Sequence, residues 1–196
     1  MTWLLCDYGE VLSLPPALDD RSDLAAAAGW DPARGDFWEA YWADRMAYDR
    51  GDVSAGGFWE AMTGRRLDPS CLDRIVARDM AMWLHPNIES IAAAERASRR
   101  GLRLAILSNA PVEVADGVDA APWLASFTRR FFSCRIRSVK PEPAIYEAVL
   151  EALRAGPEEV FFFDDRPANV AGARAAGMRA EVWGGPADFD GVKPPP

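Results

Sequence analysis

Three short apolar segments, each followed by a polar residue, constrain the fold of this chain more than any other feature. They cover Trp3 to Cys6, Leu102 to Leu107 and Val160 to Phe163. Short apolar runs of this kind are typical of strands that are buried on both faces of a sheet. A fourth, weaker segment covers Arg179 to Trp183. Because helical patterns separate these segments, the sequence predicts an α/β fold with a doubly wound parallel sheet.

The two clearest helical patterns cover residues 86–101 and 141–156. The first has a proline early, basic residues late and Gly101 at its end, which is the usual order of helix start and stop signals. In the second, apolar residues keep helical spacing, and Gly156 stands where a C-terminal cap is expected.

Residues 15–85 contain helical patterns and no convincing strand. Their turn-rich breaks indicate about four helices. We therefore expect a helical domain at 15–85, inserted into a core domain made of residues 1–14 and 86–196. We expect the tryptophans of the insertion to pack in its interior, namely Trp38, Trp42 and Trp59. The proline-ended tail GVKPPP is predicted to be disordered.

The composition narrows the classes of function. A chain of 196 residues is long enough for one core with an elaboration, and its formal charge of -8 argues against binding to nucleic acid. Its three cysteines are far apart and unpaired in sequence, which indicates neither a disulfide framework nor a zinc site. With no signal peptide and no membrane-spanning run, the sequence predicts a cytoplasmic protein that acts on small molecules.

Polar residues follow the predicted strands and begin the next helices. Because the carboxyl ends of parallel strands meet at one edge of a sheet, we expect these side chains to converge. They are Asp7, Ser108, Asn109, Lys140, Asp164 and Asp165. A carboxylate nucleophile, a hydroxyl, an ammonium and an acidic pair form the inventory of a phosphoryl-transfer site. Mg²⁺ held by the carboxylates would offset their repulsion of an anionic substrate.

Four segments in this order, DYGEVL, LSN, KPEPAIY and FFFDDRPANVAGARAAG, resemble the motifs of the haloacid dehalogenase (HAD) superfamily. The likeness is to its subclass IA phosphatases, which have a Rossmann-like core and an inserted helical C1 cap; residues 15–85 match that cap in position and length. The resemblance implies a Mg²⁺-dependent phosphatase with Asp7 as nucleophile. Lys140, Ser108 and Asn109 are then expected to bind the phosphate. The resemblance further implies metal ligands from Asp7, the Gly9 carbonyl and Asp165, with Asp164 binding directly or through a water.

The first motif departs from this family at Gly9. The family's phosphatases usually have an aspartate here, which protonates the leaving oxygen and then activates water. General acid–base assistance is typically worth about 10² to 10⁴ in rate, so its loss slows a reaction without abolishing it. We expect a slow enzyme, or one that favours good leaving groups. Glu10 is the nearest alternative acid in sequence, although adjacent residues of an extended segment point to opposite sides.

Other functions stay open at this stage. A protein that binds a phosphorylated ligand without turnover would tolerate Gly9, and so would a 2-haloacid dehalogenase, whose halide needs no proton. The acidic pair argues against the dehalogenase. The expected substrate is a small phosphorylated metabolite, contacted by one of three residues in the insertion, and the protein is expected to be a monomer or homodimer. These three residues are Arg45, Tyr48 and Arg50.

Overall fold

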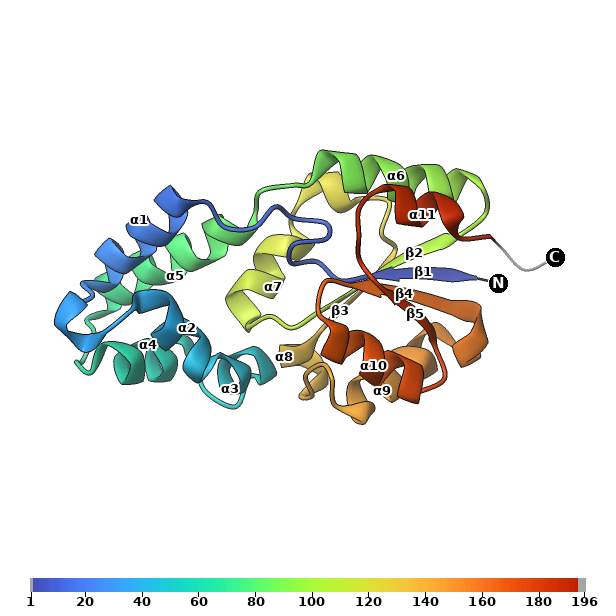
Figure 1. Cartoon of the computed structure of the whole chain (residues 1–196). Coiled ribbons are helices and arrows are strands. Elements are labelled where there is room, and N and C mark those ends of the chain that lie inside the picture. The colour runs from blue at the N-terminus through green and yellow to red at the C-terminus, as the bar shows by residue number, and fades with distance from the viewer. Residues whose placement is uncertain (1, 194–196) are drawn as a thin grey trace.

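The computed structural model describes residues 2–193 and is built on a five-stranded parallel sheet (Figure 1). Its strand order is β3-β2-β1-β4-β5, so that β1 lies beside β4 although two strands separate them in sequence. The strands are β1 (Trp3–Cys6), β2 (Arg103–Ser108), β3 (Arg129–Phe132), β4 (Val160–Asp164) and β5 (Arg179–Val182). The predicted α/β class and parallel sheet are confirmed. Strand β3 was not predicted, because its sequence RRFF begins with two arginines and it lies at an edge of the sheet.

The register of the sheet brings the polar residues after the strands to one edge. Cys6 pairs with Ile106 on one side and with Phe163 on the other. The Asp7 amide continues this ladder by donating to the Phe163 carbonyl at 2.8 Å. Asp7 therefore stands level with the ends of both neighbouring strands.

Helices cover both faces of the sheet (Figure 1). In β1, Leu4 and Cys6 point into one apolar cluster and Trp3 and Leu5 into the other, as the alternation of a strand requires. The first cluster is covered by α6 (Ile88–Arg99), α7 (Val112–Asp119) and α11 (Ala187–Gly191). The second is covered by α9 (Pro143–Leu153) and α10 (Pro167–Ala175). The short helix α8 (Ser133–Ile136) follows β3, and 3₁₀ turns occur at Pro122–Leu124 and Pro157–Glu159.

Five α-helices lie beside this core and form what we call the helical unit (Figure 1). They are α1 (Leu18–Ala28), α2 (Phe37–Ala43), α3 (Arg45–Arg50), α4 (Ala55–Thr63) and α5 (Pro69–Trp83), with a 3₁₀ turn at Pro32–Arg34. They enclose an apolar cluster of their own, in which Tyr41, Trp59 and Ile75 are fully buried. The expected number of about four is too low, because Asp44 leaves helical geometry and divides DFWEAYWADRMAY into two helices without a turn-rich break.

The chain passes between the core and the helical unit twice, and the two passages lie side by side. Ser13 and Pro86 form an antiparallel bridge. Around it, the Leu14 amide donates to the His85 carbonyl at 2.8 Å, and the Asn87 amide donates to the Leu12 carbonyl at 2.9 Å. The domain boundaries expected from the sequence fall next to this pair, and they stay a prediction.

Two local expectations are wrong. Helix α9 ends at Leu153, and Arg154 takes the left-handed capping conformation that was expected of Gly156; Gly156 instead precedes the next 3₁₀ turn as its N-cap. Val192 is buried against the core, so the predicted disorder of the GVKPPP tail fails there. Residues 194–196 of that tail lie outside the described residues.

Helix α10 approaches the segment before α9 closely, and Gly172 permits this approach. A Cβ atom at Gly172 would lie 2.8 Å from the Pro141 carbonyl oxygen and 2.9 Å from Cε2 of Tyr146. The Pro141 oxygen belongs to the backbone, so it cannot move without shifting the segment that carries Lys140. The contact therefore couples the packing of α10 to the carboxyl edge of the sheet.

We expect Gly172→Ala to lower the free energy of unfolding by about 1–3 kcal/mol, because overpacking outweighs the roughly 1 kcal/mol of helix propensity that alanine adds. Urea unfolding measures this change. Gly56→Ala in α4 is the matched control, because its Cβ would lie 3.6 Å from Leu72, an ordinary contact. The control is expected to be unchanged or slightly more stable. Equal effects of the two substitutions would contradict this interpretation.

Candidate active site

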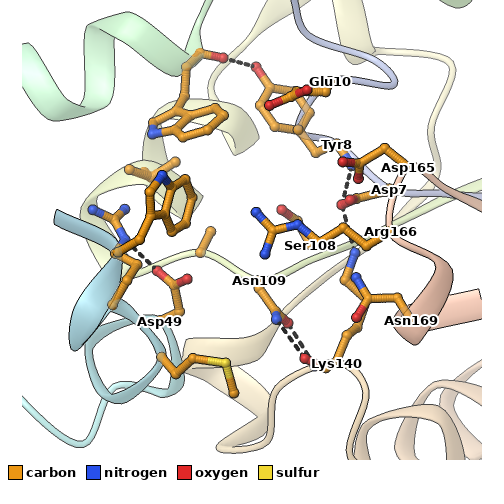
Figure 2. Close-up of a pocket in the computed structure, with 17 residues that line it drawn as sticks. Asp7, Tyr8, Glu10, Asp49, Ser108, Asn109, Lys140, Asp165, Arg166 and Asn169 are labelled. Carbon is orange, nitrogen blue, oxygen red and sulfur yellow. Dashed lines mark hydrogen bonds and ion pairs between the residues drawn. The ribbon is translucent and has the colours of Figure 1, made fainter. Parts of the chain in front are cut away.

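A cavity of about 340 Å³ lies at the carboxyl edge of the sheet, between the core and the helical unit (Figure 2). The core residues expected to form the site line one side of it, namely Asp7, Gly9, Glu10, Ser108, Asn109, Lys140 and Asp165. The helical unit lines the other side with Trp42, Arg45, Met46, Asp49 and Trp83. The structure thus brings together nearly all of the residues that the motifs indicated.

Lys140 lies at the centre of the charged groups. Its Nζ is 2.7 Å from Oδ1 of Asp7 and 2.6 Å from Oδ2 of Asp164, and it donates to the Leu107 carbonyl at 3.0 Å. All three ammonium protons therefore have partners. The residue is only 2% exposed. Burial disfavours the ammonium, but the charges of Asp164 and Asp7 outweigh it and raise the pKa of Lys140.

The acidic pair after β4 divides into two different positions. Asp164 is fully buried, and its Oδ1 accepts hydrogen bonds from the Arg166 amide at 2.8 Å and from Nδ2 of Asn169 at 2.9 Å. Asp165 is half-buried and lines the cavity. Burial raises the pKa of Asp165, and the neighbouring Asp164 charge adds to the effect. Asp164 therefore anchors Lys140, while Asp165 faces the cavity.

Asp7 is held between these groups. Its Oδ1 accepts a hydrogen bond from the Tyr8 amide at 2.6 Å in addition to the Lys140 contact. Burial raises the pKa of Asp7 to about 8; Lys140 opposes the rise and Asp164 adds to it. A second cation near Asp7 would favour its ionised form.

The three carboxylates fit a divalent cation. Asp7, Asp164 and Asp165 each offer an oxygen, and these oxygens lie within 4.8 Å of one another. Carboxylate oxygens are the ligands that Mg²⁺ prefers. Only one lysine lies among the three carboxylates, so a bound cation would offset their remaining negative charge.

Ser108 and Asn109 differ in what they leave open to a ligand. The Asn109 side chain donates to the Lys140 carbonyl at 3.0 Å and accepts from the Lys140 amide at 2.8 Å. It therefore fixes the backbone of Lys140 while also lining the cavity. The Ser108 hydroxyl lines the cavity and has no hydrogen-bond partner within residues 2–193. It is the group of this pair that is available to a phosphate oxygen.

The first motif shows what surrounds the missing acid. A Cβ at Gly9 would lie 3.6 Å from Cζ3 of Trp83, which leaves room for a side chain. Glu10 has a φ of 60°, in the left-handed region that non-glycine residues rarely adopt. Its side chain lies along the cavity, where its charge contributes to the raised pKa of Asp165. The structure thus places Glu10 on the cavity side.

Of the three residues named from the helical unit, only Arg45 reaches the cavity. Arg45 is buried and paired with Asp49 at 2.8 Å and Asp79 at 3.0 Å. Tyr48 instead donates to Oε2 of Glu113 at 2.8 Å. Arg50 forms ion pairs with Asp52 and Glu142. The latter two contacts, Tyr48–Glu113 and Arg50–Glu142, connect the helical unit to the core, away from the cavity.

Several residues at the cavity were not predicted as site residues. Arg166 covers the ring of Trp42 at 5.1 Å and forms no ion pair within the described part of the chain. Trp42 packs against the apolar cluster of the helical unit, as expected, and in addition lines the cavity, which Trp59 does not. Asn169 and Asp49 also line it. Asn169 stands inside the quoted DDRPAN segment, which was a usable signal, whereas Asp49 is one of many acidic residues of the helical unit.

The fold and this group of acidic residues around a lysine define a class of hydrolase. Residues 22–177, more than half of the chain, match the haloacid dehalogenase-like hydrolase family. The chain therefore belongs to this family. No helix among residues 2–193 is long and apolar enough to cross a membrane.

Individual relatives include both phosphatases and dehalogenases. The chain is 34% identical over 116 residues to Phosphatase MT3486 of Mycobacterium tuberculosis, a match that covers 58% of this chain and 54% of that protein. It is 35% identical over 97 residues to Haloacetate dehalogenase H-2 of Moraxella sp., covering 49% and 43%. The chain thus spans about half the length of these relatives.

A solved structure shows the same fold over most of the chain. It is the HAD family enzyme BT-2542 from Bacteroides thetaiotaomicron, which is 21% identical, covers 93% of both chains and has a TM-score of 0.72. That enzyme has also been solved in complex with magnesium and inorganic phosphate.

We expect Lys140→Met to lower the free energy of unfolding by about 3–5 kcal/mol, because it leaves buried carboxylates without their cation. The loss should be larger near pH 9 than near pH 6. Burial already raises the pKa of Asp7 to about 8, and below that pH the carboxyl takes up a proton and no longer needs a counter-ion. Urea unfolding at both pH values measures this. Lys193→Met, at the chain's only other lysine, is the control and should change little. A loss that does not depend on pH would contradict the charge argument.

Proposed function

We propose that the protein is a Mg²⁺-dependent phosphatase that acts on a small phosphorylated metabolite, with Asp7 as its nucleophile. The observation that carries this proposal is the position of Asp7, directly bound to buried Lys140 and within 4.8 Å of ligand atoms from Asp164 and Asp165. This arrangement supplies a nucleophilic oxygen together with sites for two cations, of which Lys140 is one. The phosphatase among the relatives supports the same reaction class.

Each residue has a defined task in this reaction. An Asp7 carboxylate oxygen attacks phosphorus, the bond to the leaving oxygen breaks, and an acyl phosphate forms. Lys140 and the Ser108 hydroxyl stabilise the charge on the phosphoryl oxygens. Water then attacks phosphorus, the bond between phosphorus and the Asp7 oxygen breaks, and phosphate and a proton leave the regenerated Asp7 carboxylate.

Asp7, Asp165 and the Gly9 carbonyl would hold Mg²⁺, with Asp164 behind them acting through a water or directly. The ion would neutralise charge between the carboxylates and the phosphate. The Lys140–Asp164 pair then serves mainly to fix the position of the ammonium beside Asp7. Residues 15–85 would act as a cap that closes over the substrate.

Two alternatives differ from this proposal in what they require of the site. A 2-haloacid dehalogenase needs no cation among its carboxylates, and clustering Asp7, Asp164 and Asp165 would then be costly without benefit. The dehalogenase relative nevertheless keeps this reaction as a specific alternative. A protein that only binds phospho-ligands would need the cation and Lys140 but no reactive Asp7. Both alternatives predict that phosphate esters are not hydrolysed.

Location and assembly belong to the same proposal. Cys6, Cys71 and Cys134 are free buried thiols, which is consistent with a reducing compartment such as the cytoplasm. The cavity suits a small molecule and the acidic chain does not suit nucleic acid. We propose a monomer or homodimer.

We expect Mg²⁺-dependent hydrolysis of 4-nitrophenyl phosphate, a substrate whose leaving group needs no proton. Chelation of Mg²⁺ should abolish it, and Asp7→Asn should lower kcat by about 10³-fold or more, because the amide cannot form the acyl phosphate. Release of nitrophenolate measures the rate. Asp20→Asn, an acid outside the cavity, is the control and should retain activity. If turnover is absent in the wild type, the phosphatase proposal fails, and chloride release from a 2-haloacid would favour the dehalogenase.

We expect Gly9→Asp to raise kcat/KM for alkyl phosphates by about 10-fold or more and to change the rate with 4-nitrophenyl phosphate much less. The cavity has room for the new side chain beside Trp83, and only a poor leaving group gains from an added acid. Glu10→Gln tests the native acid in the same assay. If Glu10 supplies the proton, this variant loses alkyl phosphate hydrolysis selectively. Equal effects of Gly9→Asp on both substrates would contradict our account of Gly9.

A further inference from the structure

The end of the cavity opposite Asp7 has its own chemistry. Figure 2 shows Asp49 across the cavity from the side on which Asp7 and Lys140 lie. The helical unit, which supplies Asp49, also lines the cavity with the apolar side chains of Trp42, Met46 and Trp83. If phosphate binds at Asp7, as the proposed function requires, the organic part of the substrate meets these residues.

Asp49 belongs to a buried group of charges that does not balance. Its Oδ1 accepts a hydrogen bond from Nε of Arg45 at 2.8 Å, while Nη1 of the same arginine lies 3.0 Å from Oδ2 of Asp79. Two carboxylates therefore share one guanidinium, which leaves one negative charge over. Asp79 is further satisfied by the Tyr41 hydroxyl at 2.7 Å.

Of these two carboxylates, only Asp49 is accessible to a ligand that could balance the remaining negative charge. Asp49 is 6% exposed and lines the cavity, and its Oδ2 has no hydrogen-bond partner among residues 2–193. Asp79 is 2% exposed and does not line the cavity. Oδ2 of Asp49 is thus a carboxylate oxygen that is open to the cavity, and a ligand that brings a donor to this position gains a charged hydrogen bond.

The ligand group that best fits this position is an ammonium. It would neutralise the leftover charge of Asp49 and Asp79 and donate to Oδ2 of Asp49. A second anionic group would be repelled. Arg166 does not take this role, because it is exposed, stacks on Trp42 and forms no ion pair with Asp49. Its guanidinium extends from the core side into the cavity as far as Trp42, and its charge opposes the rise that burial causes in the pKa of Asp49.

We propose that Asp49 determines specificity, and that the substrate is a phosphate ester whose organic group joins an apolar body to an ammonium. This rests on the proposed function for the position of the phosphate. The charged group of such a substrate would bind the helical unit while its phosphate binds the core, so one molecule would contact both sides of the cavity.

The test compares 4-(aminomethyl)phenyl phosphate with 4-(hydroxymethyl)phenyl phosphate, which are similar in size but differ in charge. The ratio of their kcat/KM values is measured in the wild type, in Asp49→Asn and in Asp44→Asn. Comparing ratios between variants cancels both the difference in leaving group and any loss of folded protein. We expect Asp49→Asn to lower the ratio about tenfold, the effect of a charged hydrogen bond. Asp44 is an exposed acid at the start of the same helix and does not line the cavity, so its variant should keep the wild-type ratio. An unchanged ratio in Asp49→Asn would overturn the proposal.

Two further measurements separate this inference from the proposed function. With wild-type protein alone, KM should increase from the aminomethyl to the hydroxymethyl to the 4-carboxyphenyl phosphate; the reverse order would overturn the inference even if Asp49→Asn failed to fold. If no ester is hydrolysed, the phosphatase proposal fails. The rise in Tm with each compound and Mg²⁺ then tests whether Asp49 selects an ammonium. A larger rise with the aminomethyl compound, lost in Asp49→Asn, would support the specificity of Asp49. Equal rises would reject it.

Discussion

The contact of the Lys140 ammonium with Asp7, Asp164 and the Leu107 carbonyl is the interaction on which the carboxyl edge of the sheet depends. Burying two carboxylates is expensive, and their attraction to a cation repays the cost only where the geometry is good and the remaining hydrogen bonds are made. The surroundings of Lys140 meet this condition. Asn109 fixes its backbone, Asn169 donates to Asp164, and the close approach of α10 at Gly172 holds the adjoining segment.

The helical unit contacts the core next to these same groups. Tyr8 follows Asp7 in the chain, and its hydroxyl donates to the Trp83 carbonyl at 2.8 Å. Arg50 pairs with Glu142, two residues after Lys140. The Ser133 hydroxyl donates to the Asp49 carbonyl at 2.5 Å, which ties the residue at the far end of the cavity to the core. Movement of the helical unit would therefore change contacts beside both Asp7 and Lys140.

The sequence was sufficient for the parts of this structure that follow from local patterns. Apolar runs indicated four of the five strands, and the rule that strand ends converge indicated the group around Asp7. Strand β3 was not predicted because Arg129 and Arg130 interrupt the apolar pattern of this edge strand, which pairs with β2. The domain boundaries at 14/15 and 85/86 and the roles of the site residues are still predictions.

The sequence could not predict which of several possible partners each polar side chain binds. Asn109 was expected at the phosphate, but its amide is bound to the Lys140 backbone. Asp164 and Asp165 are adjacent in sequence, yet Asp164 is buried and binds Lys140, whereas Asp165 lines the cavity. Tyr48 and Arg50 point to the core, while Asp49 between them lines the cavity. Such choices depend on distances between elements far apart in the chain.

The first motif, DYGEVL, depends both on its local sequence and on contacts with elements far apart in the chain. Glu10 keeps a left-handed backbone that costs a non-glycine residue roughly 1–2 kcal/mol, while the glycine stands one position earlier, where φ does not require it. Strain of this kind persists only where the surrounding structure imposes it. Here the effect is to place an acidic side chain along the cavity and to leave the space beside Gly9 to the ring of Trp83. The position that would otherwise carry an acid therefore faces an apolar group of the helical unit. An apolar environment next to the leaving oxygen does not supply a proton, so turnover depends either on Glu10 or on a leaving group that needs none.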